Sequence, residues 1–277
     1  MLMNERLIYD VGMHNGDDTA YYLHRGYNAI AVEADPDAAA AGRERFAKAV
    51  QESRLTILNV AIAEQRGEAE FWICDQLRVW NSFDKSNASR NGLPCHSVKV
   101  QTVPLRDLLA QHGVPYYLKL DIEGHDHIAA ADISAEDAPE FVSLEINSAD
   151  DFFLLRSKGY RRFKCIQQGY FTPVLSPHLS LASVLHVAVN RLKSTVLANR
   201  LRGMYRSLRP PRGSVQRLAT WTFAPGSSGP FGDETPGEWL PFENVLHAWL
   251  SQQLGHQLGY RTRPPGTEVW YDLHATK

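Results

Sequence analysis

A doubly wound α/β sheet is the fold class that this sequence predicts. Three observations predict it: short apolar runs alternate with helix-like segments, the first run ends in a loop with two glycines, and turn residues separate the segments regularly. The run Leu7–Val11 is short and apolar, as buried parallel strands are. Right-handed crossovers then bring successive strands into one sheet.

The first half of the chain supplies the elements after this strand. Asp17 or Asp18 can cap the first helix, Gly26 can end it, and Pro36 suits the first position of the next one. The predicted elements are a helix at Thr19–Arg25, a strand at Ala29–Glu33, a helix from Pro36 to Val50 and a strand at Leu55–Val60.

The alternation breaks after Val60 and then resumes. Two extra strands, Glu68–Ile73 and Ser97–Val103, flank a polar loop. After them the sequence predicts a helix at Leu105–Gln111, a strand at Tyr116–Asp121, a helix at His125–Ala131, a strand at Phe141–Ile146, a helix at Ala149–Lys158 and a strand at Arg162–Ile166.

The pattern dissolves from Tyr170 to Thr267 and returns as a strand at Glu268–Ala275. We expect that last strand to join the same sheet, because the segment before it has few strand signals of its own. The predicted organisation is a core at 1–168, an insertion or lid at 169–268 that is partly helical and basic, and a final strand at 269–277. A separate C-terminal domain is the alternative.

Composition excludes several classes of protein. The 277 residues carry a formal net charge of −2, which gives no general argument for nucleic-acid binding. The chain has three widely spaced cysteines, Cys74, Cys95 and Cys165. Their odd number and their spacing argue against both a disulfide framework and a zinc site. No apolar run reaches the ~20 residues of a membrane span. We expect a cytoplasmic protein.

The loop after the first strand is the main candidate binding site. Gly12 and Gly16 let the backbone approach a ligand closely, but their spacing is not the G-x-G-x-x-G that holds a diphosphate. Asp10, Asp17 and Asp18 add negative charge around the loop, which suits a ligand with a cationic end. Glu33 follows about twenty residues later, where carboxylates bind ribose hydroxyls. These features together favour a nucleoside that carries a positive charge in place of phosphates, and S-adenosylmethionine is such a compound.

Four stretches together resemble the FkbM family of methyltransferases. They are the loop in "IYDVGMHNGDD", "VEADPD" at 32–37, "LKLDIEGHD" at 118–126 and "VSLEIN" at 142–147. "LKLDIEG" after a "VPLRDLL" helix start is the most specific to the family. The chain departs from the usual D-x-G-A-N-x-G loop at Met13 and His14, so His14 stands where that family has an asparagine.

The resemblance implies a class I methyltransferase fold. This is a Rossmann-like three-layer sandwich with a mostly parallel seven-stranded sheet, an antiparallel last strand and, here, a long insertion before it. It also implies an S-adenosyl-L-methionine-dependent transferase of the EC 2.1.1 type that O-methylates a hydroxyl on a glycan or natural product. The implied cofactor-binding residues are Asp10, Gly12, His14, Asn15, Gly16, Asp17 and Glu33.

Methyl transfer to a hydroxyl needs an aligned acceptor and a group that takes its proton. Asp121 ends a predicted strand at the crevice and is the first candidate for the base or the orienting group; a role as helix cap is the alternative. His125 is the second candidate, since a histidine can act as a base near neutrality. Oxygens of Asp121, Glu145 and Asn147 could hold Mg2+, but we predict no metal site.

Two further segments suit the acceptor. "VWNSFDKSN" contains Trp80, Asn81, Ser82 and Lys85. Polar groups beside an aromatic ring suit a sugar or another hydroxylated acceptor. The alternative is that this segment is only a long surface connection. Phe231 and Trp239, in a run rich in glycine and proline, can close over a substrate, or they belong to a surface loop.

No acidic residue lies between Asp151 and Asp233, although thirteen lysines and arginines do. The apolar positions of Leu181–Leu208 recur at helical spacing beside several of them. A helix packed on the core, a dimer contact and a peripheral membrane or glycan surface stay open. The rival functions are a binding module for S-adenosylmethionine without transfer activity, an NAD-dependent oxidoreductase, which the glycine spacing disfavours, and a nucleic-acid methyltransferase.

Overall fold

The computed structural model describes residues 3–169, 171–174, 217–224, 226–257 and 270–277. The predicted helices and basic surface within Leu181–Leu208 lie outside these residues. Among the described residues, no helix has both the length and the apolar character needed to cross a membrane.

The chain begins with two strand–helix units and a third strand. β1 (Met3–Val11), α1 (Asp17–His24), β2 (Asn28–Val32), α2 (Pro36–Arg45), α3 (Ala47–Gln51) and β3 (Leu55–Leu58) follow in order. The helix expected from Pro36 to Val50 is two helices, because Phe46 leaves the helical conformation at φ −110° and ψ 25°. Its ring packs into the apolar cluster that contains Met13 and Ile57.

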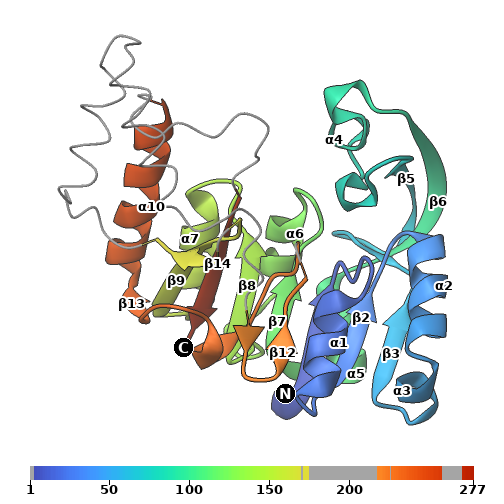
Figure 1. The fold of residues 1–277 in the computed structure, drawn as a ribbon, viewed down its shortest axis with the longest axis horizontal. Helices are drawn as coiled ribbons and strands as arrows, with labels where there is room; N and C mark the ends of the chain where they lie inside the picture. The colour runs from blue at the N-terminus through green and yellow to red at the C-terminus, as the bar shows by residue number, and fades with distance from the viewer. Residues whose placement is uncertain (1–2, 170, 175–216, 225, 258–269) are drawn as a thin grey trace.

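A second, three-stranded sheet follows. It contains β4 (Ala61–Ile62), β5 (Gly67–Cys74) and β6 (Cys95–Val103), and α4 (Lys85–Ala88) lies between the last two strands. This second sheet stands above the carboxyl ends of β2 and β3 (Figure 1). The two extra strands expected around a polar loop are therefore confirmed as an antiparallel pair.

The alternation resumes as the sequence predicts. α5 (Leu105–His112), β7 (Val114–Leu120), α6 (Asp126–Ala131), β8 (Phe141–Glu145), α7 (Asp150–Ser157) and β9 (Arg162–Gln167) follow, and β14 (Tyr271–Thr276) closes the chain. Leu105, Leu108 and Leu109 show why α5 forms, since this spacing puts three apolar side chains on one buried face.

The strand order confirms the predicted fold. Seven strands lie in the order β3-β2-β1-β7-β8-β14-β9, and β14 runs antiparallel to both of its neighbours. Two short strands, β10 (Thr172–Pro173) and β13 (Leu240–Pro241), extend the sheet beyond β9 to nine strands in all.

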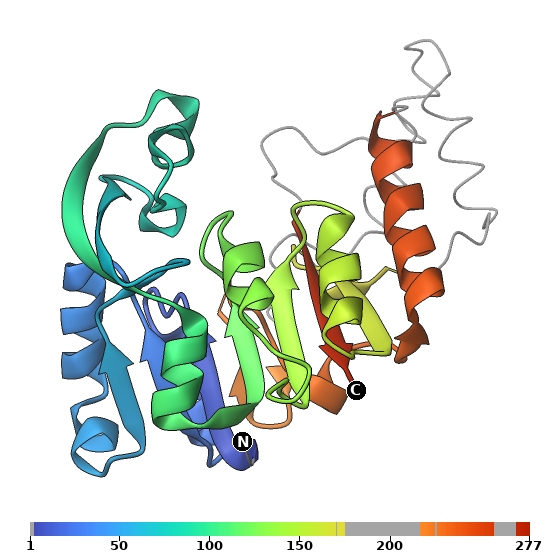
Figure 2. The same cartoon turned by 180° about the vertical axis from the view of Figure 1, so that it is seen from behind.

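Helices cover one face of this sheet along its length. α5, α6 and α7 lie there with α10 (Phe242–Gln257), which the sequence analysis did not predict (Figure 2). Phe242, Val245 and Trp249 of α10 are buried in that core, so an apolar stripe at helical spacing was present in the sequence.

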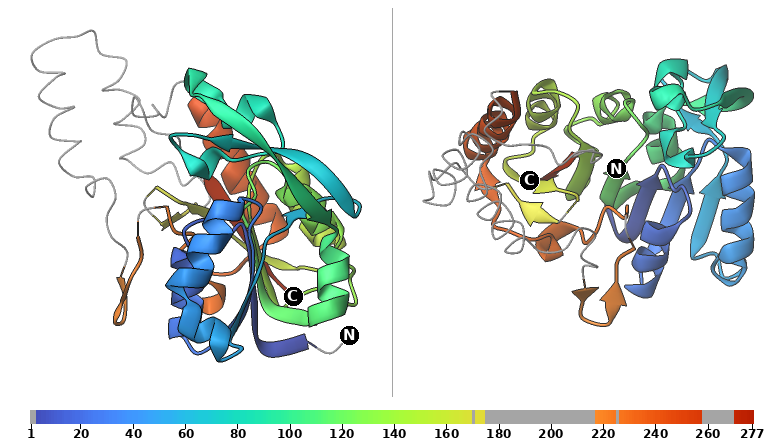
Figure 3. Two further views of the ribbon diagram at one scale, coloured as in Figure 1. Left: turned by 90° about the vertical axis from the view of Figure 1, so that its right-hand side faces the viewer. Right: turned by 45° about the horizontal axis from the view of Figure 1, so that its top comes forward.

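The other face is covered differently at its two ends. α1 and α2 pack over β1, β2 and β3, as the edge-on view shows (Figure 3, left). Beyond α1, the aromatic rings of Phe223 and Phe231 cover the sheet instead of a helix, and Phe231 stacks on Tyr117 at 4.5 Å between ring centroids. The hairpin of β11 (Arg217–Leu218) and β12 (Trp221–Thr222) leads into this covering segment.

Candidate active site

The candidate site begins at the switch point of the sheet, where β1 lies between β2 and β7. Gly12 follows β1 with φ +88°, and a Cβ there would lie 1.8 Å from the Asp121 backbone oxygen, so only glycine fits. Gly16 precedes α1 with φ +79° and contacts the Phe46 ring. Between these glycines the backbone turns back from β1 into α1.

Gly16 is the N-cap of α1, so the expected capping by Asp17 or Asp18 is wrong. Both carboxylates lie in the first turn and have other partners. Asp17 accepts a hydrogen bond from the Asn15 side chain and forms an ion pair with Arg45 at 2.9 Å. Asp18 accepts the Ser228 backbone N–H at 3.1 Å and the Ser227 hydroxyl.

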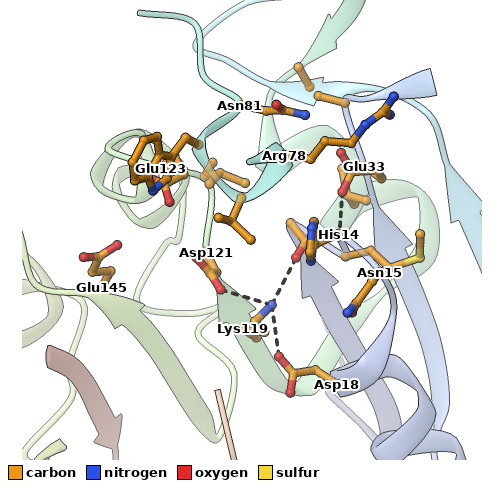
Figure 4. A pocket seen from close by; sticks show the side chains of 18 of the residues that line it. His14, Asn15, Asp18, Glu33, Arg78, Asn81, Lys119, Asp121, Glu123 and Glu145 are labelled. Atoms are coloured by element: carbon orange, nitrogen blue, oxygen red, sulfur yellow. Dashed lines mark hydrogen bonds and ion pairs between the residues drawn. The ribbon is translucent and has the colours of Figure 1, made fainter. Parts of the chain in front are cut away.

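A buried lysine lies at the centre of the switch point. Lys119, on β7, is 3% exposed, and its ammonium lies 3.0 Å from Asp10, 3.4 Å from Asp18 and 3.5 Å from Asp121. It also donates to the Gly12 backbone oxygen at 3.1 Å. Figure 4 shows the ammonium between Asp18 and Asp121. Burial alone would lower the pKa of Lys119, but these carboxylates raise it well above its ordinary value.

The carboxylate that ends β2 braces the loop. Glu33 is buried, and its two oxygens accept the backbone N–H groups of His14 at 2.7 Å and Asp35 at 2.8 Å. Burial raises the pKa of Glu33 to about 7, against these two hydrogen bonds, which lower it. Each carboxylate oxygen can accept a second hydrogen bond, so Glu33 can still bind a ligand hydroxyl.

These residues line a cavity of about 510 Å³, within the size range of small-molecule sites. Its lining contains both apolar side chains and carboxylates. The apolar side chains include Val60, Ala61, Ile62, Phe71 and Phe83. Figure 4 shows the carboxylates of Asp121, Glu123 and Glu145 on the side away from Glu33.

The segment between β5 and β6 contributes Arg78, Trp80 and Asn81 to the lining. Arg78 and the Asn81 amide both donate to Asp35, at 2.7 and 3.1 Å, and these hydrogen bonds hold the segment on the start of α2. Of the other residues expected here, Ser82 donates to the Glu123 backbone oxygen and Lys85 lies over the Trp72 ring; neither lines the cavity.

The structure brings most of the predicted site residues together. Gly12, His14, Asn15, Asp17, Glu33 and Asp121 line the cavity. Asp10 and Gly16 do not: Asp10 is fully buried behind the loop, where it holds Lys119 and the Thr19 hydroxyl. Their contribution to a ligand is therefore indirect.

His125 does not line the cavity either. It is the N-cap residue of α6, and its ring lies 5.0 Å from the Phe83 ring, centroid to centroid. Burial is the first cause that lowers the pKa of His125. The His125 ring is thus packed on the segment between β5 and β6.

The expected lid residues also pack elsewhere. Phe231 is buried on Tyr117, and Trp239 packs on Phe141 and donates to Asp233. Gly226 and Ser227, from the same part of the chain, line the cavity instead, together with Trp270. Aromatic character alone did not distinguish residues that face a ligand from residues that cover the sheet.

The sequence analysis missed Lys119 as a site residue, although a lysine inside the apolar strand "YYLKL" is a signal, because an unpaired charge is rarely buried. Arg78 and Ser227, whose partners Asp35 and Asp18 are distant in sequence, were missed as well. Within the described ranges, no group of three or more His, Cys, Asp or Glu side chains is arranged to hold a metal ion.

The family comparison matches residues 10–162, more than half of the chain, to the methyltransferase FkbM domain. No curated protein matches the chain. Among solved structures, a methyltransferase FkbM from Methylobacillus flagellatus KT is 14% identical, with a TM-score of 0.41 over 59% of this chain and 40% of its own. This chain therefore spans less than half the length of that protein.

Two other solved structures are similar. The precorrin-6y C5,15-methyltransferase from Geobacter metallireducens GS-15 is 12% identical, with a TM-score of 0.32 over 62% of this chain and 74% of its own. The StiE O-MT is 9% identical, with a TM-score of 0.38 over 98% of this chain and 68% of its own.

Proposed function

Because the chain belongs to the FkbM methyltransferase family, we propose that it transfers a methyl group from S-adenosylmethionine to a hydroxyl of a glycan or natural product. The main observation behind this proposal is the cavity beside β1. It is lined by the loop that begins at Gly12, by the Glu33 carboxylate and by apolar side chains. A core at 1–168 with an insertion at 169–268 remains the proposed organisation.

The residues present fit S-adenosylmethionine. Glu33 would bind the ribose hydroxyls, the loop from Gly12 to Asn15 the amino-acid end, and Ile62 and Phe71 the adenine ring. The carboxylates of the cavity wall together suit a ligand with a sulfonium charge, so the loss of one of them should change the affinity little. When bound, S-adenosylmethionine supplies an electrophilic methyl group; the chain's own residues orient the acceptor, exclude water and accept a proton.

Calorimetric titration tests the cofactor. We expect S-adenosylmethionine and its demethylated product to bind and NAD not to bind. Glu33→Ala should weaken binding of S-adenosylmethionine by at least about 10-fold, the equivalent of one lost hydrogen bond to a charged group. Tight NAD binding without S-adenosylmethionine binding would favour an oxidoreductase instead.

A labelled-methyl assay against a deproteinised cell extract, with mass spectrometry of the product, tests the transfer itself. Asp121→Ala should abolish incorporation while the affinity for S-adenosylmethionine stays within about 3-fold, because Asp121 lies on the acceptor side of the cavity. If the wild-type protein binds S-adenosylmethionine but labels nothing, the chain is a binding module. Salt-sensitive RNA or DNA binding would support a nucleic-acid acceptor.

A further inference from the structure

Two carboxylates on the acceptor side of the cavity have different surroundings. Asp121, directly after β7, lies 3.5 Å from the Lys119 ammonium. Glu145, the last residue of the neighbouring strand β8, is half-buried in the cavity wall. Its carboxylate receives no hydrogen bond and no ion pair from any residue that the structure describes; the Asn147 amide donates only to its backbone oxygen.

Most charged groups near Glu145 are acids. Burial and the nearby acids raise the pKa of Glu145 to about 8, and Arg90, which itself pairs with Glu123 at 2.5 Å, opposes them. Asp272, on the adjacent strand β14, is buried, and its own pKa is raised well above its ordinary value, first by burial. The acids that face Glu145 from the surrounding elements are Asp121, Glu123, Asp126 and Asp272.

Two carboxylates whose environments differ in this way commonly divide the work of one reaction. We propose that Glu145 is the base that takes the proton of the acceptor hydroxyl, and that Asp121, held by Lys119, helps to orient the acceptor molecule. This inference rests on the proposed function and assigns the proton transfer within it. It places the base on β8, and neither Asp121 nor His125 takes that role.

The acceptor O–H bond breaks and its proton goes to a Glu145 carboxylate oxygen. The acceptor oxygen forms a C–O bond to the methyl carbon, and the electron pair of the broken S–C bond stays on sulfur. Glu145 then returns the proton to water.

The same carboxylates restrict the class of acceptor. A carboxylate or phosphate group there would add negative charge to a partly desolvated wall that already carries Asp121, Glu123 and Glu145. A neutral hydroxyl adds no charge and can donate its one proton to Glu145. We therefore expect a neutral hydroxyl, and not an anionic oxygen, as the acceptor group.

The variants Glu145→Gln and Glu136→Gln test the inference with the same chemical change. Glu136 is exposed and lies outside the cavity lining, so it is the matched control. In the labelled-methyl assay on the extract, we expect Glu145→Gln to lower incorporation by at least about 100-fold, as the loss of a general base does, and Glu136→Gln to leave it unchanged. Wild-type incorporation should rise with pH up to about 8.

Two measurements need no acceptor. Calorimetry should give Glu145→Gln an affinity for S-adenosylmethionine within about 3-fold of the wild type. Infrared difference spectra should show a protonated carboxyl band that titrates near pH 8 in the wild type and in Glu136→Gln, and that is missing in Glu145→Gln.

Three outcomes would overturn the inference while leaving the proposed function intact. They are retention of more than about a tenth of the activity by Glu145→Gln, loss of its S-adenosylmethionine binding, and wild-type activity that chelation removes and Mg2+ restores. By contrast, failure of the wild-type protein to bind S-adenosylmethionine would end the proposed function itself.

Discussion

The Lys119 ammonium and the Asp10 carboxylate meet 3.0 Å apart in the interior, one from each of the two strands that flank the switch point. Neither side chain is more than 3% exposed. Because Asp18 and Asp121 also lie within 3.5 Å of this ammonium, one buried cation holds together β1, the start of α1 and the end of β7.

Replacing this cation should destabilise the protein. Lys119→Met leaves Asp10 buried without its partner, and we expect a loss of about 3–5 kcal/mol in the free energy of unfolding, measured by urea denaturation. The double variant Lys119→Met/Asp10→Asn should recover part of that loss, because it also removes the unpaired charge. Equal stability of Lys119→Met and the double variant would show that the unpaired Asp10 charge does not cause the loss.

Gly12 should tolerate no side chain. Gly12→Ala places a methyl group 1.8 Å from the Asp121 backbone oxygen, so the loop must move. We expect loss of S-adenosylmethionine binding in calorimetry and a lower melting temperature. Gly26→Ala is the control: its φ is also positive, +84°, but no atom lies within 4 Å of the added carbon. It should cost only the backbone strain, about 1–2 kcal/mol, and keep binding.

The raised pKa of Glu145 should appear in the stability of the protein. From its ordinary value of 4.5 up to about 8, the folded state holds a proton that the unfolded state has released. The free energy of unfolding of the wild type therefore falls as pH rises through this window, and Glu145 lowers it no further above about pH 8. Glu145→Gln removes this pH-dependent loss. The variant should therefore gain stability relative to the wild type between pH 5 and pH 9 in urea denaturation. Parallel pH profiles would contradict this.

Asp18 should hold the segment around Ser227 on the cavity. Its carboxylate accepts the Ser227 hydroxyl and the Ser228 backbone N–H, and each such bond contributes about 1.5–3 kcal/mol. Asp18→Asn should raise hydrogen exchange and proteolysis at 226–228 by about 10-fold or more. Asp17→Asn is the comparison, because Asp17 pairs with Arg45 instead. An equal effect of both would mean that the helix start, and not this contact, holds the segment.

The sequence by itself determined the alternation of strands and helices from β1 to β9 and the loop at Gly12, but not α10. These depend on local patterns: apolar runs such as Leu7–Val11, turn glycines, and a carboxylate about twenty residues after the loop. Errors arose where distant side chains intervene. Phe46 ends α2 because its ring packs beside Met13, and Asp18 leaves its capping role because Ser227 and Lys119 reach it.

Only the tertiary structure decided which polar side chains face the cavity. The motif "LKLDIEG" contains both Lys119 and Asp121, but nothing within it shows that Asp10 and Asp18 would neutralise the lysine. Nor does it show that no described residue would pair with the carboxylate of Glu145. Burial and pairing depend on contacts between residues more than a hundred positions apart. The pattern of a sequence fixes which elements form, whereas the charge state of a site depends on how those elements meet.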